Sequence, residues 1–154
     1  MLEHRILLLH ARTTSTRQLI VDADSGAALG YARWERERSR SWRRLLCRRV
    51  LAVHEQEDEP LLFTVHRTWT FLPRRDVWDA EGQLVGCLLG RFVQDRHGRL
   101  VAALDDGTFR DPFRRVLAQL APSAQGLRLT FHDEIAGEPF VKMLLLAAAL
   151  QTTS

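Results

Sequence analysis

Lysine, cysteine and long apolar runs are scarce in this chain of 154 residues. The scarcity of cysteine and of long apolar runs each excludes a class of protein. Lys142 is the only lysine among 22 basic residues, and all the others are arginine. Two cysteines, Cys47 and Cys87, do not make the disulfide framework of a small secreted domain. The longest apolar run, Met143–Leu150, is far shorter than the roughly twenty residues of a membrane-spanning helix. The sequence therefore predicts a protein of a reducing compartment, the cytoplasm.

The signature motifs of common enzyme classes are also missing. The chain has no G-x-S-x-G elbow, no P-loop, no G-x-G-x-x-G, no H-E-x-x-H and no C-x-x-C. Its histidines show no metal-ligand spacing, and the local acid–base candidate His132-Asp133-Glu134 is expected in a turn. The sequence predicts a non-catalytic protein with no cofactor and no metal. A small enzyme with a site at the rim of the fold is the alternative, because catalytic groups can be assembled from distant positions.

Length and pattern predict one mainly β domain over residues 1–154. Domains cluster at roughly 100–150 residues, and a hydrophobic content of 45% excludes whole-chain disorder. Short apolar runs separated by Asp and Gly turns predict strands, and Asp111-Pro112 resembles an N-cap followed by proline at the first helical position. One short helix is therefore predicted over Pro112–Leu120. The predicted strands are Arg5–His10, Gln18–Asp22, Ala28–Trp34, Arg49–His54, Leu61–Thr68, Thr70–Leu72, Asp76–Asp79, Leu84–Leu89, Arg91–Gln94, Leu100–Leu104 and Leu127–His132.

A pattern close to apolar–x–Asp–x–x–Gly–x–apolar recurs along the chain. Copies begin at Val21, Val77 and Val93 and have glycine at Gly26, Gly82 and Gly98, and a looser copy runs from Phe131 to Gly137. Aspartate accepts hydrogen bonds from its own turn, and glycine supplies the positive φ that closes a hairpin. The pattern therefore predicts hairpin turns. A calcium loop beginning at Asp22 is the alternative, but the glutamate and the further oxygen ligands of such a loop are missing.

The C-terminal segment Pro139–Leu150 is predicted as a helix, since it is rich in helix formers and has proline at its start. Lys142 alone interrupts its apolar surface, and a helix without a polar face must be enclosed. Its length of roughly 18 Å is too short for a bilayer core of about 30 Å, which favours enclosure by protein. A sheet wrapped around this helix is therefore predicted, with Lys142 reaching solvent or a strand carbonyl.

Two stretches resemble the tubby C-terminal-like superfamily, which includes tubby-like domains, phospholipid scramblases and LURP-one-related proteins. They are the hairpin Val77-Trp78-Asp79-Ala80-Glu81-Gly82-Gln83-Leu84-Val85-Gly86 and the terminal Gly137-Glu138-Pro139-Phe140-Val141-Lys142-Met143-Leu144-Leu145-Leu146-Ala147-Ala148-Ala149. The resemblance implies a closed antiparallel barrel of about twelve strands around a buried hydrophobic C-terminal helix, with lipid or protein as its ligand. The cysteine-rich acylation stretch and the proposed calcium segment of scramblases have no counterpart here. No functional residue of the family is carried over.

Most of the basic charge lies in one segment. Arg33–Arg49 carries eight arginines and two glutamates, a net charge of +6 against +3 for the whole chain. Tryptophan favours the headgroup level of a bilayer, and each basic residue near an anionic surface contributes about 1 kcal/mol. A long loop or an exposed hairpin is expected over Glu35–Arg48. The predicted binding residues are Arg33, Trp34, Arg36, Arg38, Arg40, Trp42, Arg43, Arg44, Arg48 and Arg49.

The sequence therefore predicts a non-catalytic module that binds anionic phospholipid or phosphoinositide headgroups, peripherally at a membrane. In a second reading, the same segment docks an acidic protein partner or a second copy of the chain. In a third, it binds the phosphates of a nucleic acid. In a fourth, it is a solvated loop whose arginines pair with Glu35, Glu37 and the acidic run Glu55–Glu59.

Overall fold

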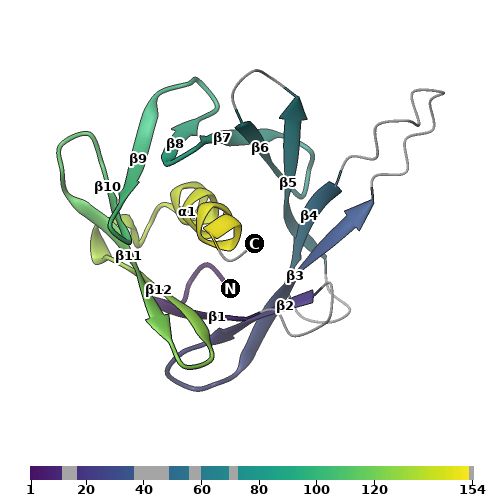
Figure 1. The fold of residues 1–154 in the computed structure, drawn as a ribbon, viewed down its shortest axis with the longest axis vertical. Helices are drawn as coiled ribbons and strands as arrows, with labels where there is room; N and C mark the ends of the chain where they lie inside the picture. The colour runs from purple at the N-terminus through teal and green to yellow at the C-terminus, as the bar shows by residue number, and fades with distance from the viewer. Residues whose placement is uncertain (12–16, 37–48, 56–59, 70–72, 153–154) are drawn as a thin grey trace.

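The computed structural model describes residues 1–11, 17–36, 49–55, 60–69 and 73–152, with the backbone alone at positions 36, 49, 68 and 69. Twelve antiparallel strands form a closed barrel around one helix, α1 (Pro139–Thr152), as Figure 1 shows. Each strand pairs with its neighbours along the chain, and β1 closes the barrel against β12. The strands are β1 (Ile6–His10), β2 (Arg17–Asp22), β3 (Ala28–Arg36), β4 (Arg49–His54), β5 (Leu61–Trp69), β6 (Pro73–Asp79), β7 (Leu84–Leu89), β8 (Phe92–Asp95), β9 (Leu100–Asp105), β10 (Thr108–Arg110), β11 (Val116–Ser123) and β12 (Gly126–Phe131).

This architecture confirms the predicted fold class, a closed antiparallel barrel around a buried C-terminal helix. The core consists of alternate strand residues that face the helix, such as Leu9, Val65 and Phe109, packed against the apolar surface of α1. Leu145 and Leu146 on α1 are fully buried. The helix needs no polar face because the wall surrounds it. No described helix is long and apolar enough to cross a membrane.

Because successive strands run in opposite directions, successive connections lie alternately at one end of the barrel and at the other. The helix-start end is where β1 and α1 both begin, and it also holds the turns at residues 23–27, 80–83, 96–99 and 111–115. The helix-stop end is the opposite end, toward which α1 runs, and it holds the connections that follow β1, β3, β5, β7, β9 and β11. The arginine-rich connection at residues 37–48 follows β3 and belongs to the helix-stop end.

The short helix predicted over Pro112–Leu120 is wrong. Residues 111–115 form the turn between β10 and β11, and β11 pairs with β10 on one side and with β12 on the other. Two flanking strands satisfy the backbone groups of β11 on both sides, which a short surface helix would not do. The short helix that the structure does contain is η1 (Asp133–Ile135), a 3₁₀ turn where the sequence predicts a turn. The predicted strand Thr70–Leu72 lies outside the described residues.

Lys142 lies in the barrel instead of reaching solvent. Its side chain is 5% exposed, its Nζ donates to the carbonyl of Leu2 at 2.9 Å, and it lies 5.6 Å from the ring centre of Phe131. The acceptor is therefore a carbonyl of the N-terminal segment before β1 and not of a strand, which corrects the prediction. The same segment is held by its ammonium group, which bonds Glu55 at 2.5 Å. These contacts fasten the N-terminal segment beside the start of α1.

Gly86 on β7 marks a point where the wall and the helix meet closely. A Cβ built there would overlap the carbonyl oxygen of Gln94 and lie 3.0 Å from Cδ2 of Leu144 on α1. We expect Gly86→Ala to lower the free energy of unfolding by about 1–3 kcal/mol, the usual effect of overpacking a core. Urea titration measures the loss. Gly137→Ala is the matched control, because a Cβ at Gly137 meets nothing within 4 Å. Equal stability of the two variants would contradict the close approach.

Candidate anion-binding surfaces

The predicted binding segment joins β3 to β4 at the helix-stop end. The two strands pair antiparallel as far as Arg36 opposite Arg49, so the connection at residues 37–48 links neighbouring strands, as an exposed hairpin would. Most of the predicted binding residues lie outside the described residues: Arg38, Arg40, Trp42, Arg43, Arg44 and Arg48.

Arg33 and Trp34, the two predicted binding residues with described side chains, have different surroundings. Arg33 donates to Oε1 of Glu35 from Nε at 3.1 Å and also from Nη2. This hydrogen bonding and the charge of Glu35 raise the pKa of Arg33. Trp34 is partly buried and packs against the core of the barrel. The ion pair is one that the solvated-loop interpretation predicts, and Trp34 takes part in the packing of the barrel.

A row of four arginine positions crosses β3, β4, β5 and β6 near the helix-stop end. Arg36 lies opposite Arg49, and Arg67 lies opposite Arg75. The register of β4 and β5 pairs Val50 with His66, so its next step brings position 49 opposite Arg67. At a strand spacing of about 4.8 Å, the row spans roughly 14 Å. Residues scattered over forty positions of the sequence thus become immediate neighbours.

The row lies on the inner face of the wall, at the rim of the barrel. Val65 and Val77 are buried, and they stand two residues from Arg67 and Arg75 on the same strand faces. Arg67 is exposed and Arg75 is half-buried. Burial, and then the charge of Arg67, lower the pKa of Arg75. Two guanidinium groups on directly opposite residues present adjacent planar donor sets, which suit the oxygens of an anion such as phosphate.

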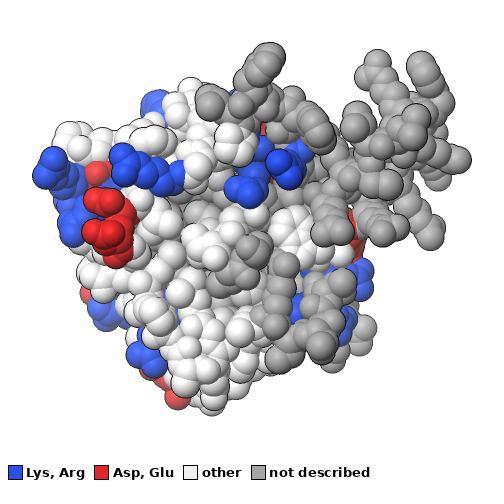
Figure 2. Space-filling view, in the orientation of Figure 1, with Lys and Arg blue, Asp and Glu red and all other residues white. Residues whose placement is uncertain are grey.

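Further basic residues face outward at the same end. Arg74 pairs with Asp76 at 2.7 Å, and Arg17 lies 4.5 Å from the ring centre of Tyr31, which in turn stacks on His54. Figure 2 shows basic atoms over β5 and β6, beside the residues drawn in grey. Sequence reasoning missed Arg17, Arg67, Arg74 and Arg75 because each stands apart from the Arg33–Arg49 segment. The signal that finds them is strand register.

The predicted hairpin turns are confirmed between β2 and β3, where Asp22 and Gly26 stand, and at Asp79 and Asp95. The looser copy is wrong as a hairpin, because Asp133 begins the 3₁₀ turn η1, which leads from β12 to α1. In the turns at Asp79 and Asp95, and in a third turn of this kind at Asp111, the aspartate carboxylate accepts the backbone N–H of the residue four positions on, at 2.7–2.9 Å. Burial acts to raise the pKa of Asp111, but hydrogen bonds from Arg115 and Phe113 together with the Arg115 charge outweigh it, so the pKa falls below its ordinary value. The carboxylates of these aspartates already accept hydrogen bonds from their own turns, which disfavours their binding a cation.

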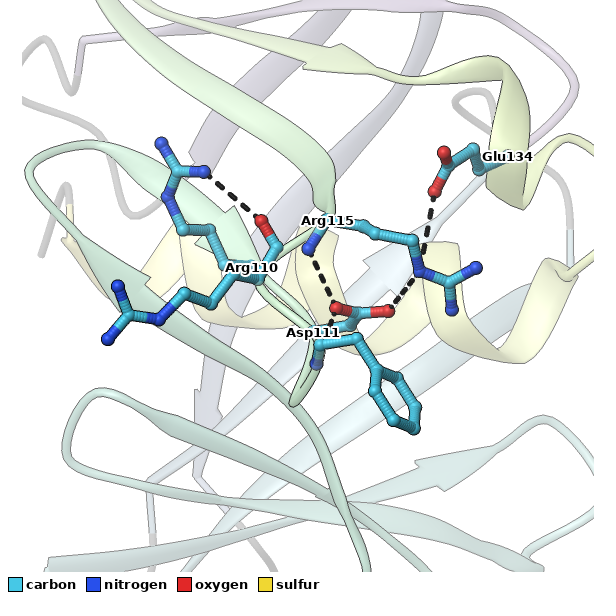
Figure 3. Close-up of polar contacts among 6 residues, drawn as sticks. Arg110, Asp111, Arg115 and Glu134 are labelled. Atoms are coloured by element: carbon cyan, nitrogen blue, oxygen red, sulfur yellow. Dashed lines mark hydrogen bonds and ion pairs between the residues drawn. The ribbon is translucent and has the colours of Figure 1, made fainter.

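The third turn has arginine where the other two have glycine. Arg114 adopts φ 64°, beside 76° at Gly82 and 78° at Gly98. This left-handed conformation costs a residue with a Cβ roughly 1–2 kcal/mol. Figure 3 shows Arg115 reaching over Asp111 toward Glu134, with Arg110 on the other side of the turn. Arg115 Nε lies 2.7 Å from Asp111 and 4.0 Å from Glu134, whereas Nη1 of Arg110 donates to the carbonyl of Arg114 at 3.2 Å.

Exchanging the residues at this turn position is expected to change stability in opposite directions. Arg114→Gly should raise the free energy of unfolding by about 1 kcal/mol, because glycine adopts the positive φ without strain. Gly98→Arg should lower it by a similar amount in the turn with the same hydrogen bonding. Urea midpoints of the two variants test this pair. A loss of stability in Arg114→Gly would show that the arginine side chain stabilises the fold by more than its backbone strain costs.

Cys87 and clusters of metal-ligating side chains are the remaining candidates in the described ranges. Cys87 is buried, as predicted, and its thiol lies 3.6 Å from Oε1 of Gln94; burial foremost raises its pKa, which disfavours the reactive thiolate. No group of three or more His, Cys, Asp or Glu side chains among the described residues could hold a metal ion. Cys47 lies outside the described residues.

Comparisons of the chain with protein-family models, with curated proteins and with solved structures find no match. The barrel and its central helix have the layout that a tubby-like family implies, but no comparison names a family. The resemblance therefore stays a prediction from the sequence. Any function must be argued from the surfaces of this chain itself.

Proposed function

We propose that this barrel is a non-catalytic module that binds anionic phospholipid or phosphoinositide headgroups through its helix-stop end. The observation that supports it is the row of four arginine positions beside a connection that carries five more arginines. Only Glu37 opposes them within the connection, and Glu35 pairs with Arg33 outside the row. Each basic residue near an anionic bilayer contributes about 1 kcal/mol, so this end has enough charge to hold the domain at a membrane without a lipid anchor.

The two parts of this surface have different tasks. The connection at residues 37–48 supplies charge that attracts any anionic bilayer, an attraction that salt screens. The row supplies Arg67 and Arg75 on directly opposite strand positions, and the planar forks of arginine suit phosphate oxygens. A headgroup with several phosphates can meet neighbouring members of the row at once, whereas a phosphatidylserine headgroup presents a single phosphate. The row therefore favours phosphoinositides over phosphatidylserine at equal surface charge.

Co-sedimentation with vesicles tests the proposal. The wild type should bind phosphatidylcholine vesicles that contain phosphatidylserine or phosphatidylinositol bisphosphate, and should not bind phosphatidylcholine alone. Arg40→Glu/Arg43→Glu/Arg44→Glu should weaken binding to both anionic vesicles at least about tenfold. No binding of the wild type to either anionic vesicle would overturn the proposal and leave an acidic protein partner for the segment.

A second pair of variants tests the row. Arg67→Gln/Arg75→Gln should lose the preference for phosphatidylinositol bisphosphate over phosphatidylserine at matched surface charge. Arg96→Gln/Arg128→Gln removes the same charge from exposed positions away from the helix-stop end and should keep that preference. Equal behaviour of the two double variants would show that the row acts through net charge alone.

A further inference from the structure

A second group of arginines lies on the outer wall of the barrel, away from the arginine-rich connection. Arg91, Arg110 and Arg114 line a hollow of about 550 Å³ together with Ala103, Asp105 and Asp111. Figure 1 places β8, β9 and β10 across the barrel from β3 and β4, and Figure 2 shows basic atoms gathered over β9 and β10. The outer-wall hollow therefore lies on the opposite side of the barrel from the arginine-rich connection, and Arg91 and Asp105 bring it to the helix-stop end.

Two arginines of the hollow have no carboxylate partner in the part of the chain that the structure describes. The carboxylate of Asp111 is occupied by Arg115, at 2.7 Å, and by backbone N–H groups of its own turn. Asp105 lies 3.9 Å from Arg91. Arg110 donates to the carbonyl of Arg114, and neither residue forms an ion pair with another described residue. Both guanidinium groups thus retain donors for an anionic group from outside.

The backbone conformation of Arg114 is strained for a residue with a side chain, so arginine at this position lowers the stability of the fold relative to glycine. Glycine fills the same position in the turns at Asp79 and Asp95, and Arg114 is held at φ 64° in its place. Backbone strain of this kind clusters at functional sites, where the side chain is needed for something other than folding. Arg114 has no hydrogen-bonded role for its guanidinium in the described structure that would offset the strain.

Exposed aromatic rings flank the hollow. Phe113, at the tip of the turn, is 80% exposed, with the guanidinium of Arg115 5.7 Å from its ring centre. Phe92 on β8 is 40% exposed, with Arg91 5.1 Å from its ring centre. Exposed aromatic residues beside arginines are typical of protein–protein interfaces, where the ring supplies buried area and the arginine supplies directed hydrogen bonds.

We propose that the outer-wall hollow, with the turn 111–115 at its edge, binds an acidic segment of a partner protein. Arg110 and Arg114 receive a carboxylate, and Phe113 packs against an apolar side chain of the same segment. Charge complementarity selects this occupant, since the two unpaired guanidinium groups are the part of the surface that lacks its counter-charge.

Fluorescence anisotropy with a labelled peptide in which Glu alternates with Leu tests the proposal on the full chain. The wild type should bind this peptide and should not bind a matched peptide in which Gln replaces Glu. Arg114→Gly should weaken binding about tenfold, the effect of losing one charge-assisted contact. Because the same substitution is expected to stabilise the fold, weaker binding cannot be attributed to unfolding. Phe113→Ser should weaken binding as well, and Arg96→Gln/Arg128→Gln should leave it unchanged.

Several results would overturn the proposal. One is wild-type binding that is absent or equally strong for the Gln peptide. Another is an affinity of Arg114→Gly for the Glu peptide equal to that of the wild type. Sedimentation that shows a dimer lost in Arg110→Gln/Arg114→Gln would assign the hollow to a second copy of the chain. Weaker vesicle binding by that variant than by Arg96→Gln/Arg128→Gln would assign the hollow to the membrane. The lipid proposal is tested by different variants, so failure of one leaves the other intact.

Discussion

Leu145→Asp is expected to abolish the native barrel. Leu145 lies in the middle of α1 and is fully buried by the surrounding wall. The substitution removes roughly 2 kcal/mol of apolar burial and places a carboxylate where desolvation costs several kcal/mol. Together these losses approach the whole stability of an ordinary domain, about 5–15 kcal/mol. Near-ultraviolet circular dichroism and a urea titration should show loss of fixed packing and of the cooperative transition.

Phe140→Asp is the matched control on the same helix. Phe140 lies in the first turn of α1 and is 56% exposed, so aspartate there remains in contact with water. A carboxylate near a helix N-terminus is favourable by roughly 0.3–1 kcal/mol. The control should therefore unfold close to the wild-type midpoint. Cooperative, wild-type unfolding of Leu145→Asp would contradict the enclosure of α1.

An enclosed helix also limits where a ligand can bind. Leu145, Leu146 and Phe109 fill the space that an open barrel of this kind would offer to a small molecule. Binding is left to the rim and to the outer wall, where the described arginines lie. The arginine row and the outer-wall hollow both lie outside the interior that the C-terminal helix fills.

Local signals were sufficient to predict most of the fold. The all-round apolar character of Pro139–Leu150 predicts an enclosed helix, and the Asp-x-x-Gly turns predict hairpins, because both depend on neighbouring residues alone. The helix predicted after Asp111-Pro112 is wrong because aspartate before proline commonly begins either a helix or a turn. The equal spacing of Asp79, Asp95 and Asp111 would have decided for a turn. Arg114 hid that repeat by standing where glycine is expected.

The candidate site was predictable only in part, for a different reason. The Arg33–Arg49 segment is visible because its charge is continuous along the chain. Arg67 and Arg75 join it only through the register of β4 with β5 and of β5 with β6, and register depends on long-range pairing. The same holds for Arg91, in the turn before β8, and Arg110, on β10, which line one hollow. Isolated arginines in a sequence rich in arginine give no local sign of such neighbours.

The charge and the hydrogen bond of Lys142 are expected to stabilise the contact between the N-terminal segment and α1, and their loss should lower the free energy of unfolding. Lys142→Glu removes the bond to the Leu2 carbonyl and brings a carboxylate toward that oxygen and toward the ring face of Phe131. Both neighbours are electron-rich and repel an anion, so a loss of about 3 kcal/mol or more is expected. Thermal and urea unfolding at neutral pH measure it.

Lys142→Met separates the lost charge from the lost hydrogen bond. Methionine keeps the apolar stem of the lysine and removes a charge that is costly to bury, but leaves the Leu2 carbonyl without its donor, which costs about 1–3 kcal/mol. These effects oppose each other, so the stability of Lys142→Met should lie well above that of Lys142→Glu. Equal losses in the two variants would mean that the hydrogen bond alone holds the segment. Wild-type stability in Lys142→Glu would mean that the N-terminal segment can leave the helix without loosening the barrel.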